Sequence, residues 1–230
     1  MRNYLVVGGS SGIGLQVVKD LTAQGHAVYA TFNQNVVTDI PAAKFYPLNV
    51  LDDSIDLSFL PAQLDGVVYC PGAIALRPFA RISPADFIAD YQLQVVGAIK
   101  IIQAALPMLK ANENASIVLF STVAVQLGLN FHSLVSTSKG AIEGLTKALS
   151  AELAPTIRVN CIAPSLTDTP LAASLLNTEQ KIEANAQRHP LKRIGSPTDI
   201  SNMVDFLLSS KASWITGQIL HIDGGMSAIK

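Results

Sequence analysis

The sequence predicts an α/β fold: a single doubly wound parallel sheet of about seven strands with helices on both faces. Short runs rich in β-branched residues alternate with longer helical patterns from one end of the chain to the other. Such an alternation requires crossover connections, and therefore a parallel sheet that helices cover on both sides. The 230 residues are enough for one sizeable core, and no repeat, linker or low-complexity tract divides them. We expect one domain over residues 1–230.

The strands are expected where short apolar runs end at Gly, Pro or polar residues. They cover residues 4–9, 26–32, a short stretch near Phe45, 65–70, 116–121, 156–164 and 218–222. The third strand lies in the compressed segment QNVVTDIPAAKFYPL (34–48), which leaves no room for a long helix before it.

The helices are expected where apolar residues recur at helical spacing between recognisable stop signals. They cover residues 12–25, 84–110, 133–153 and 197–209. Gly25 ends the first of these helices, and Pro155 closes the third.

Composition narrows the class of partner and the compartment. Apolar residues make up 49% of the chain, charged residues 14%, and the formal net charge is −1, without a basic block. We therefore expect no nucleic-acid partner. The apolar runs are interrupted before the ~18 residues that a membrane span needs, and the apolar part of MRNYLVVGG is too short for a signal peptide. We expect a cytoplasmic protein that does not bind membranes.

The two cysteines are typical of small buried thiols. Cys70 and Cys161 end or interrupt apolar runs, and no metal-ligand spacing accompanies either of them. If the fifth strand separates the fourth from the sixth, the two thiols lie about 9.5 Å apart, beyond the reach of a disulfide. We expect neither a disulfide nor a metal site.

A glycine-rich loop, GGSSGIG at residues 8–14, joins the first strand to the first helix. Gly8 permits a tight turn, Gly12 lets a pyrophosphate approach the backbone, and Gly14 allows close packing of helix on strand. The helix N-terminus then offers free N–H groups to phosphates. The spacing is G-x3-G-x-G rather than the general G-x-G-x-x-G, but its place after the first strand predicts a dinucleotide site. This site includes the other loop residues Ser10, Ser11 and Ile13.

With this loop, three further segments resemble the short-chain dehydrogenase/reductase family, and the likeness covers essentially the whole chain. They are RVNCIAPSLTDTP (158–170), SKGAIEGLTKALSAELAP (138–155) and the C-terminal stretch from PLKRIGSP to HIDGG (190–225). The resemblance implies a Rossmann-type fold, an NAD(P)(H) cofactor and a small-molecule carbonyl or alcohol substrate. It also implies a homotetramer, or at least a dimer, that pairs helices 84–110 and 133–153 and the C-terminal strand between subunits.

The family's reaction uses an Asn, a Ser, a Tyr and a Lys. The Tyr donates a proton to the carbonyl as hydride arrives, and the Lys lowers the pKa of the Tyr and holds the nicotinamide ribose. Position by position, the resemblance assigns the Lys to Lys139, the Ser to Thr122 and the Asn to Gln94. The Tyr falls on Val135, which has no proton to give. Two groups are candidates to replace it: His132, three residues before Val135, and Tyr91, three residues before Gln94.

The resemblance also implies the cofactor contacts outside the glycine loop. These are Asn33, Asn49, Val50, Cys70, Pro71, Gly72, Lys139, Pro164, Thr167 and Thr169. A site for NAD expects an acid near position 32 or 33, but the sequence there is Thr31-Phe32-Asn33. No carboxylate repels a 2′-phosphate, and no arginine is there to bind one. We expect NADP(H) in preference to NAD(H).

Three functions remain open. The chain is an NAD(P)(H)-dependent oxidoreductase with an altered proton donor, a catalytically inactive nucleotide-binding or regulatory protein, or a non-redox lyase or isomerase that uses the same cleft. The glycine loop and Lys139 favour the first two, whereas Val135 favours the second and third. Residues 171–193 are where the family closes over its substrate, and the apolar first half of this segment suggests a small or moderately apolar ligand.

Overall fold

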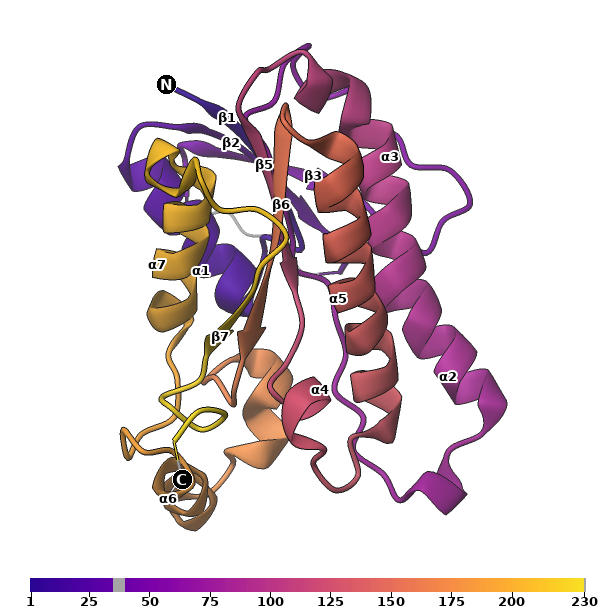
Figure 1. Cartoon of the computed structure of the whole chain (residues 1–230), viewed down its shortest axis with the longest axis vertical. Coiled ribbons are helices and arrows are strands. Elements are labelled where there is room, and N and C mark those ends of the chain that lie inside the picture. The colour runs from indigo at the N-terminus through magenta and orange to yellow at the C-terminus, as the bar shows by residue number, and fades with distance from the viewer. Residues whose placement is uncertain (35–39, 230) are drawn as a thin grey trace.

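The computed structural model describes residues 1–34 and 40–229 (Figure 1). Its strands form one parallel sheet in the order β3-β2-β1-β4-β5-β6-β7, which confirms the predicted fold class. The strands are β1 (Asn3–Val7), β2 (Ala27–Phe32), β3 (Ala43–Pro47), β4 (Gly66–Tyr69), β5 (Ala115–Phe120), β6 (Ile157–Pro164) and β7 (Ile219–Ile222). The order reverses between β1 and β4, and ligands of such sheets bind beyond the carboxyl ends of the strands at this point.

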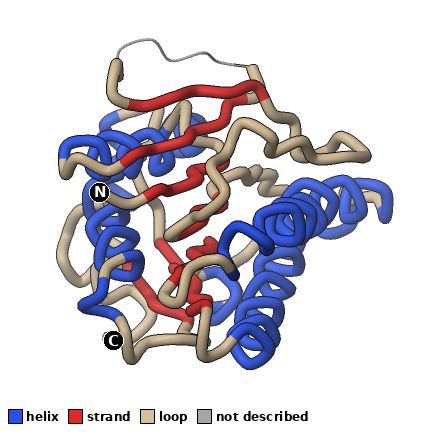
Figure 2. Tube along the Cα trace, turned by 90° about the horizontal axis from the view of Figure 1, so that it is seen from above, coloured by secondary structure: helices blue, strands red, loops and turns tan. Residues whose placement is uncertain are grey.

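Helices cover both faces of the sheet (Figures 1 and 2). They are α1 (Gly12–Ala23), α2 (Pro84–Tyr91), α3 (Gly97–Lys110), α4 (Ala124–Leu127), α5 (Ser133–Leu153), α6 (Glu179–Gln187) and α7 (Pro197–Leu208). Helices α1 and α7 bury side chains such as Leu21 and Val204 on one face, and α3 and α5 bury Ile101 and Ile142 on the other. Each buried aliphatic side chain stabilises the fold by about 1.5–3 kcal/mol relative to its exposure to water.

Helices α2 and α7 begin with the same local device. Ser83 and Ser196 each accept a hydrogen bond from the backbone N–H three residues later, and the Asp at that third position accepts one from the backbone N–H of the Ser. A Pro follows each Ser at the first helical position, where its missing N–H costs nothing. These capping boxes explain why both helices begin where the sequence predicts.

The helix expected over residues 84–110 is interrupted. A π-helical turn, Gln92–Val96, separates α2 from α3 and directs Gln94 into the interior. By length and composition alone, the whole run Pro84–Lys110 is long and apolar enough to span a membrane. The sequence analysis did not predict such a segment, because charged residues interrupt the apolar pattern. Its inward face, with Val95 and Leu109, packs on the sheet, as in the core helix of an α/β protein.

Two smaller expectations concern the third strand and the cysteines. Strand β3 contains Phe45, as predicted, whereas the stretch before it includes residues 35–39 and lies partly outside the described residues. Strand β5 separates β4 from β6, and Cys70 and Cys161 are both free thiols.

Candidate active site

A cavity of about 740 Å³ opens beyond the carboxyl ends of the strands. All the residues predicted for the site line it except Tyr91: Gly8, Ser10, Ser11, Gly12, Ile13, Gly14, Asn33, Asn49, Val50, Cys70, Pro71, Gly72, Gln94, Thr122, His132, Lys139, Pro164, Thr167 and Thr169. They come from the segments that follow β1, β2, β3, β4, β5 and β6, from the π-helical turn and from the start of α5. The fold therefore brings together side chains that are up to 161 positions apart, from Gly8 to Thr169.

The glycine loop has the backbone geometry that its sequence suggests. Gly8 (φ +72°) and Gly12 (φ +51°) both lie in the left-handed region, which glycine adopts without a steric penalty. A Cβ on Gly14 would overlap the carbonyl oxygen of Gly8, so the close packing there is against the loop rather than against the strand. Helix α1 begins at Gly12, and its first N–H groups have no partner within the helix. The loop can therefore cradle a diphosphate.

Asn33 and Asn49 lie on the side of the cavity next to β2 and β3. Asn33 is exposed directly after β2. The side-chain oxygen of Asn49 accepts a hydrogen bond from the backbone N–H of Leu51 at 3.1 Å, and its amide donates to Asp52 at 2.8 Å. The Asn49 side chain is thus fixed by its own turn, and a carbonyl oxygen can accept a second bond.

Lys139 reaches the cavity from α5 and is partly buried. Burial lowers the pKa of its ammonium group to about 8, although the nearby thiols and the carboxylate of Asp90 act in the opposite direction. A Cβ placed on Gly72 would lie 3.6 Å from Lys139 Nζ and 3.4 Å from Gln94 Oε1. The absence of a side chain at Gly72 therefore keeps open the point where these two polar atoms converge.

Gln94 is held by a buried network that the sequence pattern did not predict. Its amide nitrogen lies 2.8 Å from both carboxylate oxygens of Asp90, and the hydroxyl of Ser138 donates to the same carboxylate at 2.6 Å. All three side chains are at least nine-tenths buried, and Gln94 Oε1 has no hydrogen-bond partner among the described residues. Asp90, an acid four positions before Gln94 in the same helical run, was the available signal.

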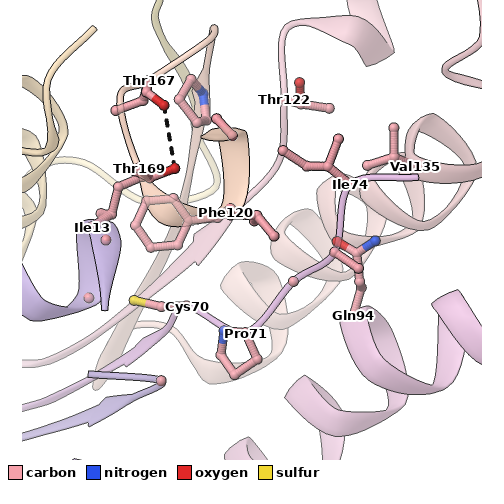
Figure 3. Close-up of a pocket in the computed structure, with 18 of the residues that line it drawn as sticks. Ile13, Cys70, Pro71, Ile74, Gln94, Phe120, Thr122, Val135, Thr167 and Thr169 are labelled. Atoms are coloured by element: carbon pink, nitrogen blue, oxygen red, sulfur yellow. Dashed lines mark hydrogen bonds between the residues drawn. The ribbon is translucent and has the colours of Figure 1, made fainter. Parts of the chain in front are cut away.

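Val135, at the position of the expected proton donor, lines the cavity and is only 6% exposed. In the close-up, Thr122, Ile74 and Gln94 lie on the same side of the view as Val135, with Ile74 between Thr122 and Gln94 (Figure 3). The imidazole of His132 lies with Nδ1 2.7 Å from the carbonyl oxygen of Asn130. Since a carbonyl oxygen only accepts, Nδ1 carries the hydrogen, and Nε2 remains for a ligand.

Tyr91 does not line the cavity, so the structure removes it as a candidate proton donor. Its side chain is 40% exposed on α2. The π-helical turn that begins at Gln92 rotates the chain less per residue than an α-helix does, so Tyr91 and Gln94 face different directions.

Cys70, Pro71 and Phe120 contribute an apolar floor. Burial raises the pKa of the Cys70 thiol to about 12, which keeps it uncharged and a poor nucleophile. Pro71 packs against the glycine loop, since a Cβ on Gly8 would lie 3.3 Å from its ring.

The wall beyond β6 carries polar groups that were not predicted. Ser165, Asn185, Arg188 and His189 line the cavity there, and Thr167 and Thr169 continue the same loop. Thr169 Oγ1 donates to the carbonyl oxygen of Thr167 at 3.4 Å (Figure 3). Ser165 and His189 are 24 positions apart and belong to different elements, so no spacing in the sequence links them.

Known proteins match the chain over nearly its whole length. Residues 7–227 match the family described as Enoyl-(Acyl carrier protein) reductase. A tropinone reductase homolog of Arabidopsis thaliana is 31% identical, over 98% of this chain and 92% of that protein.

Solved structures agree with the sequence comparison. A short chain dehydrogenase family protein of Francisella tularensis superposes with a TM-score of 0.90 at 29% identity, and covers 99% of both chains. Aldohexose dehydrogenase of Thermoplasma acidophilum superposes with a TM-score of 0.91 at 25% identity, over 100% of this chain and 95% of that chain. The chain belongs to the short-chain dehydrogenase/reductase family of NAD(P)(H)-binding oxidoreductases.

Proposed function

We propose that this protein is an NAD(P)(H)-dependent oxidoreductase that interconverts a small carbonyl compound and its alcohol with a proton donor other than tyrosine. The observation that carries this proposal is the composition of one cavity. Its glycine loop suits a diphosphate, and Lys139 lies in the same cavity beside the apolar Val135. When bound, the dinucleotide supplies or accepts the hydride.

Lys139 and the glycine loop are proposed to hold the dinucleotide. The N–H groups at the start of α1 would bind the phosphates, and the ammonium group of Lys139 would donate to the ribose hydroxyls. Asn33 lines the cavity, and its neutral amide stands where an NAD site has a carboxylate, which would repel the 2′-phosphate of NADP(H). This supports NADP(H) in preference to NAD(H).

His132 is proposed to move the proton and Thr122 to bind the substrate oxygen. Nε2 of His132 is the one nitrogen of the ring left for a ligand, because Nδ1 bonds Asn130. The oxygen of Thr122 accepts from the N–H of Ala124 at 3.3 Å, so its hydroxyl hydrogen remains for the substrate oxygen. A positioned general acid contributes about 10²- to 10⁴-fold, whereas positioning of the reactants is worth ~10⁵ or more in effective molarity. Hydride transfer can therefore proceed without the tyrosine.

One observation favours a second function, a non-catalytic dinucleotide-binding protein. Val135 is nearly fully buried and carries no titratable group, and the Cys70 thiol elsewhere in the cavity lining is held uncharged. In that case the cavity would bind the dinucleotide but would have no group that donates a proton to a substrate.

Carbonyl-dependent consumption of NADPH and NADH by the parent protein distinguishes the two functions. We expect oxidation of the cofactor by at least one member of a panel of simple ketones and aldehydes, and a loss of about 10²-fold or more in His132→Gln. His221→Gln is the matched control, because His221 lies on β7 and does not line the cavity. Binding of the dinucleotide with no consumption for any carbonyl compound would favour the non-catalytic function.

A further inference from the structure

The unpredicted wall beyond β6 contains a hydrogen-bonded chain that ends at the cavity. Ser165 Oγ lies 2.8 Å from Nε2 of His189, and Nδ1 of His189 lies 2.8 Å from the carbonyl oxygen of Asn185. The imidazole is only 3% exposed, whereas Ser165 is partly exposed in the cavity. The wall therefore presents a serine hydroxyl whose orientation is set by a buried histidine.

The state of His189 decides what the hydroxyl of Ser165 offers to a ligand. Nδ1 faces a carbonyl oxygen and must carry a hydrogen. If His189 is neutral, Nε2 accepts the hydrogen of Ser165, and only serine lone pairs remain for the cavity. If His189 is an imidazolium, Nε2 donates to Ser165, and the serine hydrogen can bond another acceptor. In the structure this acceptor is the thioether of Met226, with Sδ 3.2 Å from Ser165 Oγ, and it is a weak acceptor that a carboxylate would replace. The pair is thus able to bind a hydrogen-bond acceptor when it takes up a proton.

Charge around the cavity favours an anionic ligand, and a bound anion would in turn stabilise the imidazolium. The chain has 16 Lys and Arg residues and 17 Asp and Glu residues, so a cavity lined at random would include both cationic and anionic side chains. Among the described residues, no Asp or Glu lines the cavity, whereas Lys139 and Arg188 do. Lys139 is committed to the cofactor in the proposed function. Arg188 directly precedes His189, and its Nη1 lies 3.4 Å from Asn185 Oδ1 at the end of α6.

The other charged groups near the imidazole are already satisfied. Asp223, on the loop whose Gly224 faces the His189 ring, accepts hydrogen bonds from the N–H groups of Gly225 and Ser227. The ammonium group of Lys192 donates to the carbonyl oxygen of Gln187 and does not line the cavity. Neither group competes for a ligand at Ser165.

We propose that this wall binds the carboxylate of an oxo-acid substrate. Ser165 donates to one carboxylate oxygen, the His189 imidazolium supports Ser165 from behind, and Arg188 supplies the opposite charge at the surface. Leu171, Leu175 and Met226 line the same part of the cavity and contact the aliphatic part of the ligand. The inference rests on the proposed function, because the carbonyl group of the same molecule must reach the dinucleotide beside Lys139.

The test uses linear oxo acids from 3-oxobutanoate to 6-oxoheptanoate, each paired with its methyl ester. Each compound is titrated calorimetrically into the parent protein saturated with NADP⁺, so that binding is measured without turnover. We expect at least one acid to bind tenfold or more tightly than its ester, with proton uptake that appears as a dependence of the heat on the ionisation enthalpy of the buffer. Ser165→Ala and Arg188→Gln should each weaken binding of the acid by a larger factor than binding of its ester, and so reduce or remove this preference.

Lys192→Gln is the matched control, because it removes a nearby cation that does not line the cavity. Ser165→Gly repeats the test with the smaller residue, in case the alanine variant does not fold. If NADP⁺ binds but every acid and ester pair binds equally, or if the variants keep the preference, the inference is wrong and the proposed function stands. If NADP⁺ itself does not bind, the proposed function fails first.

Discussion

Lys139 and Val135 lie one helical turn apart on α5, and both line the cavity. Burying a lysine costs free energy, and burial here lowers the pKa of Lys139 to about 8. In the family, such a lysine acts on a tyrosine as well as on the cofactor. With a valine at position 135, the proposed role that remains is contact with the nicotinamide ribose.

Val135→Tyr tests whether position 135 can hold the proton donor. The side chain lines the cavity, so we expect the larger ring to be accommodated and carbonyl reduction to appear or to increase modestly in NADPH consumption assays. Val135→Phe is the control, because it adds the same ring without the hydroxyl. If instead residue 135 tolerates no larger side chain, overpacking should cost about 1–3 kcal/mol and lower the Tm of both variants. A stable Val135→Tyr that binds the dinucleotide and gains no activity would count against the proposed geometry.

The pH dependence of cofactor binding tests the role of Lys139. Its pKa is lowered to about 8, so the side chain is charged below that pH and neutral above it. We therefore expect the affinity for NADPH to fall as the pH rises through about 8, as measured by calorimetric titration. Lys139→Arg keeps its charge over the whole range and should show a flatter profile. Parallel profiles for the two proteins would show that Lys139 does not contact the cofactor.

At the scale of elements, the loop between β1 and α1 gives the clearest prediction. Gly12 has φ +51°, and a Cβ there would lie 3.4 Å from Thr169, at the wall of the cavity. Gly12→Val should therefore remove dinucleotide binding. Gly25→Val is the matched control, because Gly25 also has a positive φ (+78°) but nothing lies within 4 Å of its added Cβ, and Gly25 does not line the cavity. Both variants lose stability through backbone strain, and only Gly12→Val should lose binding of NADPH and NADH.

The order of the elements was predictable because apolar residues recur with different periods in strands and in helices. In addition, the residues that end a helix or strand lie next to it in the sequence. The predicted strand at 65–70 and helix at 197–209 match β4 and α7 closely. Helix α6 was not predicted as a helix, since its sequence EQKIEANAQ is mostly exposed and offers no apolar stripe. The π-helical turn at 92–96 accompanies the burial of Gln94 and Asp90 against Ser138 of α5, a contact between helices that local propensity does not contain.

The site was predictable where the family motif specifies a position and unpredictable where the fold alone makes a contact. The glycine spacing and the position of Lys139 are sequence features, and the structure places both in the cavity, whereas their contact with the cofactor stays a prediction. Ser138 and Asp90 meet across two helices, and Ser165 and His189 meet across a strand end and a loop. Neither pair has a fixed spacing that a sequence pattern could reveal.

The whole molecule exposes large apolar side chains that a monomer would leave in water. Phe79 is 72% exposed and Ile88 63% exposed around the start of α2, and Trp214 is 98% exposed before β7. The resemblance to the family implies that subunits pair through helices 84–110 and 133–153 and through the C-terminal strand. We predict a homotetramer, or at least a dimer, with Ile88 and Trp214 protected from solvent. A monomer mass by light scattering at micromolar concentration would refute this assembly.

The central claim is that this chain is a dinucleotide-dependent oxidoreductase whose cavity holds NAD(P)(H) at the glycine loop. Calorimetric titration of the parent protein with NADPH and with NADH tests it most directly, because binding needs no knowledge of the substrate. We predict one site per chain for a reduced dinucleotide, tighter for NADPH than for NADH, and no binding of either to Gly12→Val. No heat of binding for either cofactor at millimolar concentration, from a protein that is folded by circular dichroism, would contradict the claim.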